Sequence, residues 1–170
     1  WAQFKSVEIL ASIDASEELG EYIRKEMNWD TILKNRELIR SLTHIKIKIA
    51  PTVSVFNIMH LPDLYQQCLA NKFITKDGLY INILDRPLHY NVQIFPENLK
   101  NQISEKYRLF FEWMKNNEIP RAVQQQFQEC LNYMLADDKS NYWPKFVAET
   151  KKLDEMRKEN INDLLKLSYS

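Results

Sequence analysis

Three short runs of apolar and β-branched residues are separated by long segments with helical periodicity, and this pattern limits the possible folds most. Residues 7–13, 45–56 and 79–84 form these runs, which predict strands. Antiparallel neighbours need only a tight turn, whereas parallel neighbours need a crossover of about a dozen residues or more, usually a helix. The spacing therefore predicts parallel strands joined by right-handed helical connections.

The connecting segments carry apolar residues at helical spacing. Asn28 is suited to cap the start of the first helix, and Gly78 marks the turn into the third strand. The stripes are Trp29, Ile32, Leu33, Arg36, Ile39 and Leu42 in the first segment, and Leu61, Leu64, Tyr65, Cys68, Leu69 and Phe73 in the second.

The rest of the chain is predicted to be mainly helical. Residues 88–95 predict one more short strand, and Pro96 and Pro120 each suit the first turn of a helix. The helical faces are Val123, Phe127, Cys130, Leu131 and Met134, and then Phe146, Thr150, Leu153, Arg157 and Ile161.

These elements predict an α/β fold. It is either a partial parallel (β/α) barrel of about three β/α units or part of an open doubly wound sheet, followed by a helical C-terminal extension. The corresponding domains are residues 1–95 and 96–170. The alternation of Lys46 and Lys48 with isoleucines is unusual for a strand covered on both faces, and it favours an edge position or a partly open barrel.

Composition excludes several classes of function. The 23 basic and 23 acidic residues cancel, so nothing favours a nucleic-acid or anionic-membrane partner. Only 2 glycines are present, too few for a P-loop or a Rossmann fingerprint. No signal peptide or membrane-spanning run is present, which predicts a soluble, cytoplasmic protein. The start at Trp1, close before a predicted strand, favours a piece of a larger protein.

The cysteines and histidines predict no metal site. Cys68 and Cys130 are far apart and lie on apolar stripes, so they are interpreted as core residues. His44, His60 and His89 lack the spacing of metal ligands and are expected at the surface or at helix caps.

Polar residues at the predicted strand ends are the candidate site. Ser12 and Asp14 end the first strand, and the carboxyl ends of strands form the active-site face of α/β barrels. The alternative is that Asp14 or Ser16 caps the helix that begins near Glu17. The same argument applies more weakly to Thr52, Asn57 and Asn82.

Several segments, in the correct order from about residue 4 to residue 165, match a known pattern. On these segments the chain resembles radical S-adenosylmethionine proteins with SPASM or twitch extensions. The matching segments are Ser12-Ile13-Asp14-Ala15, Tyr22-Ile23-Arg24, Trp29-Asp30-Thr31-Ile32-Leu33-Lys34-Asn35, Pro51-Thr52-Val53-Ser54-Val55-Phe56-Asn57-Ile58, Leu61-Pro62, Pro96-Glu97-Asn98-Leu99-Lys100 and Leu153-Asp154-Glu155-Met156-Arg157.

The resemblance implies a six-stranded parallel partial barrel, of which this chain supplies the last three strands. It implies that Ser12 binds the ribose or methionine part of S-adenosylmethionine, that Asp14 orders the same loop, and that Arg24 pairs with the methionine carboxylate. Ala15 stands where the family has glycine, which would be strained if that position needs a positive φ.

The implied reaction is reductive cleavage of S-adenosylmethionine to a 5′-deoxyadenosyl radical, which takes hydrogen from a peptide or small-molecule substrate. The cysteines for the 4Fe-4S cluster would lie upstream of this chain, so the chain alone is not expected to be active. A non-catalytic α/β protein-interaction module is the alternative.

Overall fold

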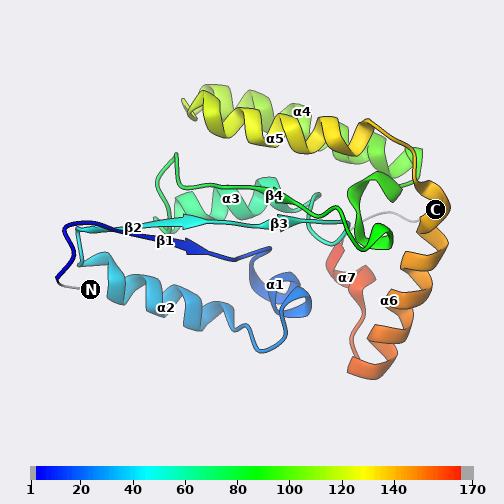
Figure 1. Ribbon diagram of the computed structural model, residues 1–170, viewed down its shortest axis with the longest axis horizontal. Helices are drawn as coiled ribbons and strands as arrows, with labels where there is room; N and C mark the ends of the chain where they lie inside the picture. The colour runs from blue at the N-terminus through cyan, green and yellow to red at the C-terminus, as the bar shows by residue number, and fades with distance from the viewer. Residues whose placement is uncertain (1–2, 166–170) are drawn as a thin grey trace.

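The computed structural model describes residues 3–165, in which short strands alternate with helices before a helical C-terminal part (Figure 1). The predicted α/β class is confirmed. The elements are, in order, β1 (Val7–Ala11), α1 (Glu17–Ile23), α2 (Trp29–Arg40), β2 (Ile45–Ile49), β3 (Thr52–Val53), α3 (Leu61–Ala70), β4 (Asn82–Ile83), the 3₁₀ helices η1 (Leu88–Tyr90) and η2 (Val92–Ile94), α4 (Glu97–Asn116), α5 (Arg121–Leu135), the 3₁₀ helix η3 (Ser140–Tyr142), α6 (Trp143–Arg157) and α7 (Ile161–Leu165).

The strands pair in parallel, as their spacing predicts, but residues 3–165 form two small sheets and close no barrel. β1 pairs with β2, and β3 pairs with β4 with Thr52 opposite Asn82. A parallel bridge between Ile49 and Leu79 links the two sheets. Because the pairing is parallel throughout, the carboxyl ends of these strands face the same way, toward α1 and α7 in Figure 1.

The run 45–56 forms two strands rather than the single one expected. Proline has no N–H to donate, and Pro51 lies between β2 and β3. The sheet continues across the break, because the Ala50 N–H donates to Ala11 O at 2.8 Å and the Asn82 N–H donates to Pro51 O at 2.9 Å. After Val53 the chain leaves the sheet and turns toward α3.

The alternation in β2 reflects one exposed face of the β1–β2 sheet. Lys46 lies opposite Glu8, and Lys48 lies opposite Leu10, which is 53% exposed. The Lys48 Nζ also reaches the Glu8 carboxylate at 2.9 Å. The isoleucines of β2 point to the other face and pack in the core.

The prediction of a strand over residues 88–95 is wrong, because the segment forms η1 and η2. The side chain of Asn91 separates the two turns: its Oδ1 accepts from the Gln93 N–H at 2.9 Å, and its Nδ2 donates to Leu84 O at 3.0 Å. Val92 and Ile94 are fully buried. Burial of these apolar residues therefore comes from tight turns rather than from a strand face.

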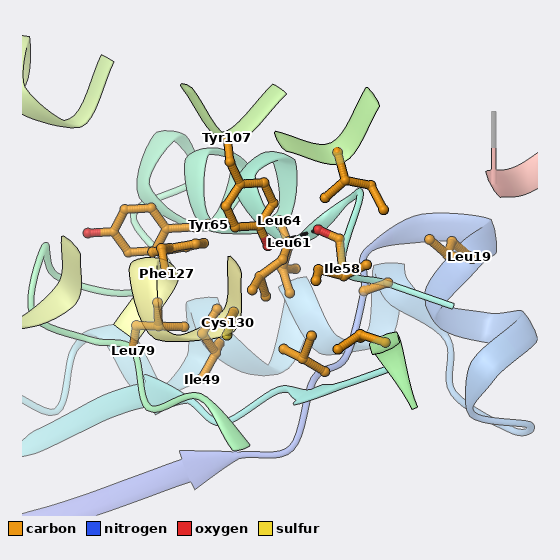
Figure 2. Close-up of a cluster of buried hydrophobic side chains, with 14 of the residues drawn as sticks. Leu19, Ile49, Ile58, Leu61, Leu64, Tyr65, Leu79, Tyr107, Phe127 and Cys130 are labelled. Carbon is orange, nitrogen blue, oxygen red and sulfur yellow. Dashed lines mark hydrogen bonds between the residues drawn. The ribbon is translucent and has the colours of Figure 1, made fainter. Parts of the chain in front are cut away.

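The core lies between the sheet and the helices α3, α4 and α5 (Figure 2). The rings of Tyr65 and Phe127 pack edge to face with their centroids 5.6 Å apart, and the Tyr107 hydroxyl donates to Ile58 O at 3.0 Å. Cys68 and Cys130 are buried in this core, as predicted. Burial raises the pKa of each thiol to about 12.

The helical face expected from Phe146 to Ile161 is interrupted. α6 ends at Arg157, because Lys158 adopts a left-handed conformation with φ 56°, and Ile161 begins the separate helix α7. This turn directs α7 back onto α1 (Figure 1). None of the helices in residues 3–165 is both long and apolar enough to cross a membrane.

Candidate functional site

Asp14 is the centre of a polar cluster at the carboxyl ends of β1 and β3. Its carboxylate accepts two hydrogen bonds of 2.7 Å, one from the Thr52 N–H to Oδ1 and one from the Arg24 Nε–H to Oδ2. The residue is only 6% exposed. A buried carboxylate needs such partners, and here they join the end of β1, the start of β3 and the end of α1.

Arg24 lies where α1 ends, and its own N–H donates to Gly20 O at 2.9 Å. Its Nε is taken by Asp14, whereas its two Nη groups donate to no residue in the described range 3–165. The side chain is 43% exposed. Forked donors held in place at one nitrogen and open at the others are suited to an anionic group.

Asn57 connects the same loops through its side-chain amide. The Nδ2 donates to Asp14 O at 2.9 Å and to Thr52 O at 3.0 Å, and the Oδ1 accepts from the Ser54 N–H at 2.8 Å. Asn57 is 1% exposed. With both ends of its amide engaged by backbone, Asn57 holds the site together rather than facing a ligand.

Ser12 and Asn82 lie beside this cluster but make no side-chain hydrogen bond within residues 3–165. Asn82 is exposed on β4 opposite Thr52. Ser12 is exposed, whereas Asp14 is buried. The Ile13 N–H donates to Ala11 O at 2.9 Å, so the chain has already turned and strand alternation no longer places Ser12 and Asp14 on one side.

The capping interpretation of this loop is not supported. Ser16 occupies the N-cap position of α1 but makes no side-chain capping bond, and both carboxylate oxygens of Asp14 are engaged elsewhere. The positive φ in this loop lies at Glu17, with φ 52°, and not at Ala15. Alanine in place of the family glycine is therefore not strained here.

A cavity of about 640 Å³ opens beside this loop. Its walls come from the start of α1, the start of α3 and α7, and they carry more acidic than basic side chains. At the edge of the cavity, the Lys106 Nζ from α4 lies 2.5 Å from the Asp63 carboxylate. The lining residues are Ala15, Ser16, Glu17, Glu18, Leu19, His60, Asp63, Gln67, Asp163 and Leu164.

Sequence reasoning missed the residues that α7 brings to this cavity. His60 precedes α3, and its Nε2 lies 3.0 Å from Leu165 O, at the end of α7. The two residues are 105 positions apart, and no spacing signal in the sequence connects them.

The residues described here hold no group of three or more His, Cys, Asp or Glu side chains arranged to bind a metal. His44 lies just before β2, and His89 packs against the Tyr90 ring at 4.3 Å. The histidines therefore belong to separate parts of the surface and the core boundary.

No protein-family model, curated protein or solved structure matches this chain. The site is therefore interpreted from its own geometry and chemistry. That geometry brings together Asp14, Arg24, Thr52 and Asn57 and leaves Ser12 and Asn82 at the edge of the cluster.

Proposed function

We propose that this chain forms the last three strands of the partial barrel of a radical S-adenosylmethionine enzyme and supplies contacts to that cofactor. One observation carries the proposal: Asp14 holds the Arg24 guanidinium at the carboxyl end of parallel strands with its Nη groups open. The motif resemblance points to the same two residues.

The arrangement of the strands is compatible with a partial barrel. Within residues 3–165, β1 pairs on one side only, so its other edge is open to further parallel strands. The upstream strands of a barrel would add at this edge, next to the exposed Leu10. Barrel formation is thus part of the proposal, since the described strands make two small sheets.

Arg24 fits the methionine carboxylate of S-adenosylmethionine. Two parallel N–H donors match the two oxygens of a carboxylate, and the bond from Nε to Asp14 fixes the plane of the guanidinium. Ser12 and Asn82, exposed nearby, offer a hydroxyl and an amide to the ribose or to the substrate. Asp14 and Asn57 keep the loop in shape, because the backbone and Arg24 engage them.

The described residues do not supply ligands for an iron–sulfur cluster. Cys68 and Cys130 are buried in the core with raised pKa values, whereas cluster ligands are thiolates. The proposal therefore places the cluster cysteines outside this chain. When bound to such a cluster, S-adenosylmethionine supplies a radical by one-electron cleavage, and the residues here bind and orient it.

The test is a titration of the isotope-labelled chain with S-adenosylmethionine, followed by NMR. Shifts should be concentrated in residues 12–24 and around Thr52. Replacing Arg24 with Gln should weaken binding about tenfold or more, because a charge-assisted pair of hydrogen bonds is lost.

The matched control is Arg40→Gln. Arg40 is an exposed arginine at the end of α2, and among residues 3–165 its side chain pairs only with Glu37 of its own helix. Equal affinity in the wild type, Arg24→Gln and Arg40→Gln would remove Arg24 from the site. Absence of any shift in residues 12–24 would instead favour the protein-interaction module.

A further inference from the structure

We infer that Asp154 and Arg157 are positioning residues that hold α1, and with it the Asp14–Arg24 pair, from the far end of the chain. The inference rests on the proposed function for its ligand but not for its geometry. It gives a role to the Leu153-Asp154-Glu155-Met156-Arg157 segment, which the site itself does not include.

Asp154 joins α1 to α7 through one carboxylate. Its Oδ1 accepts from the Tyr22 hydroxyl at 2.8 Å, and its Oδ2 accepts from the Ile161 N–H, at the start of α7, at 3.1 Å. Burial, together with the Asp154 carboxylate, raises the pKa of Tyr22, so its hydroxyl remains a donor over the physiological pH range. Both acceptor oxygens of Asp154 are thus used to connect helices.

Arg157 binds the same residue of α1 at its backbone. Its Nη1 donates to Tyr22 O at 3.1 Å, and its guanidinium lies over the Tyr22 ring, 5.6 Å from the centroid. Tyr22 is therefore held at its hydroxyl, its ring and its carbonyl by residues more than 130 positions away in sequence.

Packing extends this connection to the strand-end loops. The centroid of the Phe56 ring lies 6.1 Å from that of Tyr22 in α1 and 5.4 Å from that of Phe146 in α6. Phe56 directly precedes Asn57, whose amide binds Asp14 O and Thr52 O. The α6 helix thus reaches the polar cluster by two routes, through α1 and through the loop after β3.

The helices α1 and α7 contact each other, and Leu19 and Ile161 are among the buried core residues that they contribute. Two cavities, of about 640 Å³ and about 510 Å³, border both helices, and Glu18 and Leu164 line each of them. Beside these cavities, the hydrogen bonds of Tyr22 with Asp154 and Arg157 join α1 to α6. Since Arg24 is only two residues beyond Tyr22, rotation of α1 would move Arg24 away from Asp14.

The test compares Asp154→Asn with Glu155→Gln in the 170-residue chain. Both changes remove one carboxylate from α6, but the exposed side chain of Glu155 makes no hydrogen bond to a described residue. The asparagine amide can accept from only one of its two present donors. Tyr22→Phe, which removes the hydroxyl and keeps the ring, serves as a second variant should Asp154→Asn fail to fold.

Three quantities are measured: exchange of the Arg24 Nε–H signal, exchange of the amides in residues 19–24, and the dissociation constant for S-adenosylmethionine. We expect Asp154→Asn and Tyr22→Phe to speed both exchange processes about fivefold or more and to weaken binding about fivefold. Glu155→Gln should leave all three unchanged, and amides of α4 should exchange as in the wild type.

The outcomes separate this inference from the proposed function. Unchanged exchange at Arg24 and residues 19–24 overturns the positioning role whether or not the cofactor binds. Faster exchange with unchanged affinity also overturns it, since ligand binding would then not depend on how α6 holds α1 and Arg24. Faster exchange in a chain that never binds S-adenosylmethionine supports the positioning role and removes the proposed function alone.

Discussion

Asn57 illustrates how one buried side chain can determine the shape of the site. Replacing it with Ala would leave Asp14 O, Thr52 O and the Ser54 N–H without their present partners in a buried place. Each unsatisfied buried group costs about 1–3 kcal/mol, so we expect Asn57→Ala to lower the free energy of unfolding by about 3 kcal/mol. Urea unfolding followed by circular dichroism measures this change.

Asn101→Ala is the control for this substitution, because the Asn101 side chain is exposed on α4 and makes no hydrogen bond to a described residue. Its effect should lie within about 0.5 kcal/mol of zero. If Asn57→Ala lowered the free energy of unfolding as little as Asn101→Ala, water would have replaced the missing amide.

At this scale the sequence predicted the residues better than their roles. The strand-end argument identified Asp14, Thr52 and Asn57, because it needs only parallel strands and their carboxyl ends. It could not show that Asn57 faces backbone rather than ligand, since its partners lie up to 43 positions away. It misplaced Ser12 relative to Asp14, because the turn at Ile13 is not visible as a sequence signal.

Among the elements, α2 begins at an N-cap that the sequence predicts. The Asn28 Oδ1 accepts from the Thr31 N–H at 2.8 Å and from the Thr31 hydroxyl at 2.7 Å, as expected for a helix start. Replacing Asn28 with Ala should cost about 1 kcal/mol of unfolding free energy, and hydrogen exchange should quicken in the first turn of α2.

Asn35→Ala tests whether that loss belongs to the cap. Asn35 is exposed in the middle of α2, where alanine has the higher helix propensity, so this change should leave stability equal or slightly higher. Matching losses at Asn28 and Asn35 would contradict the capping role.

The elements whose prediction was wrong, in type or in bounds, share a physical cause. The alternating residues 88–95 suit a strand by pattern, yet the buried Asn91 amide holds them in two tight turns through Leu84 O and the Gln93 N–H. The run 45–56 is rich in apolar and β-branched residues but is interrupted at Pro51. Local patterns therefore located the apolar residues correctly but not the hydrogen-bond partners that select the backbone conformation.

On the scale of the whole molecule, the order of strands and helices was predictable and the placement of α7 was not. Parallel pairing follows from the length of the connections, whereas α7 reaches α1 and His60, at the start of α3, only because Lys158 turns the chain back after α6. Lysine is not a residue type that favours a left-handed conformation, so the turn at Lys158 cannot be predicted from the sequence. The wall of the cavity beside Asp14 thus depends on contacts that only the folded chain creates.

The buried thiols make the stability of the whole molecule sensitive to alkaline pH. Burial raises the pKa of Cys68 and of Cys130 from 9.0 to about 12, so the folded state retains protons that the unfolded chain releases. Below pH 9 the thiols are protonated in both states and the folded state keeps the full stabilisation that the raised pKa gives. That stabilisation is lost progressively as the pH rises from 9 toward 12. At pH 10 each thiol should lower the free energy of unfolding by about 1 kcal/mol relative to pH 8.

Urea unfolding between pH 8 and pH 10 tests this expectation by comparing Cys130→Ala with Val123→Ala. Both changes shorten a buried side chain of α5 and should reduce stability at every pH, but only the first removes an ionisable group. The decline with pH should therefore become shallower in Cys130→Ala and stay as in the wild type in Val123→Ala. Parallel curves for all three proteins would mean that Cys130 does not ionise differently in the two states, and hence that solvent reaches the space between α4 and α5.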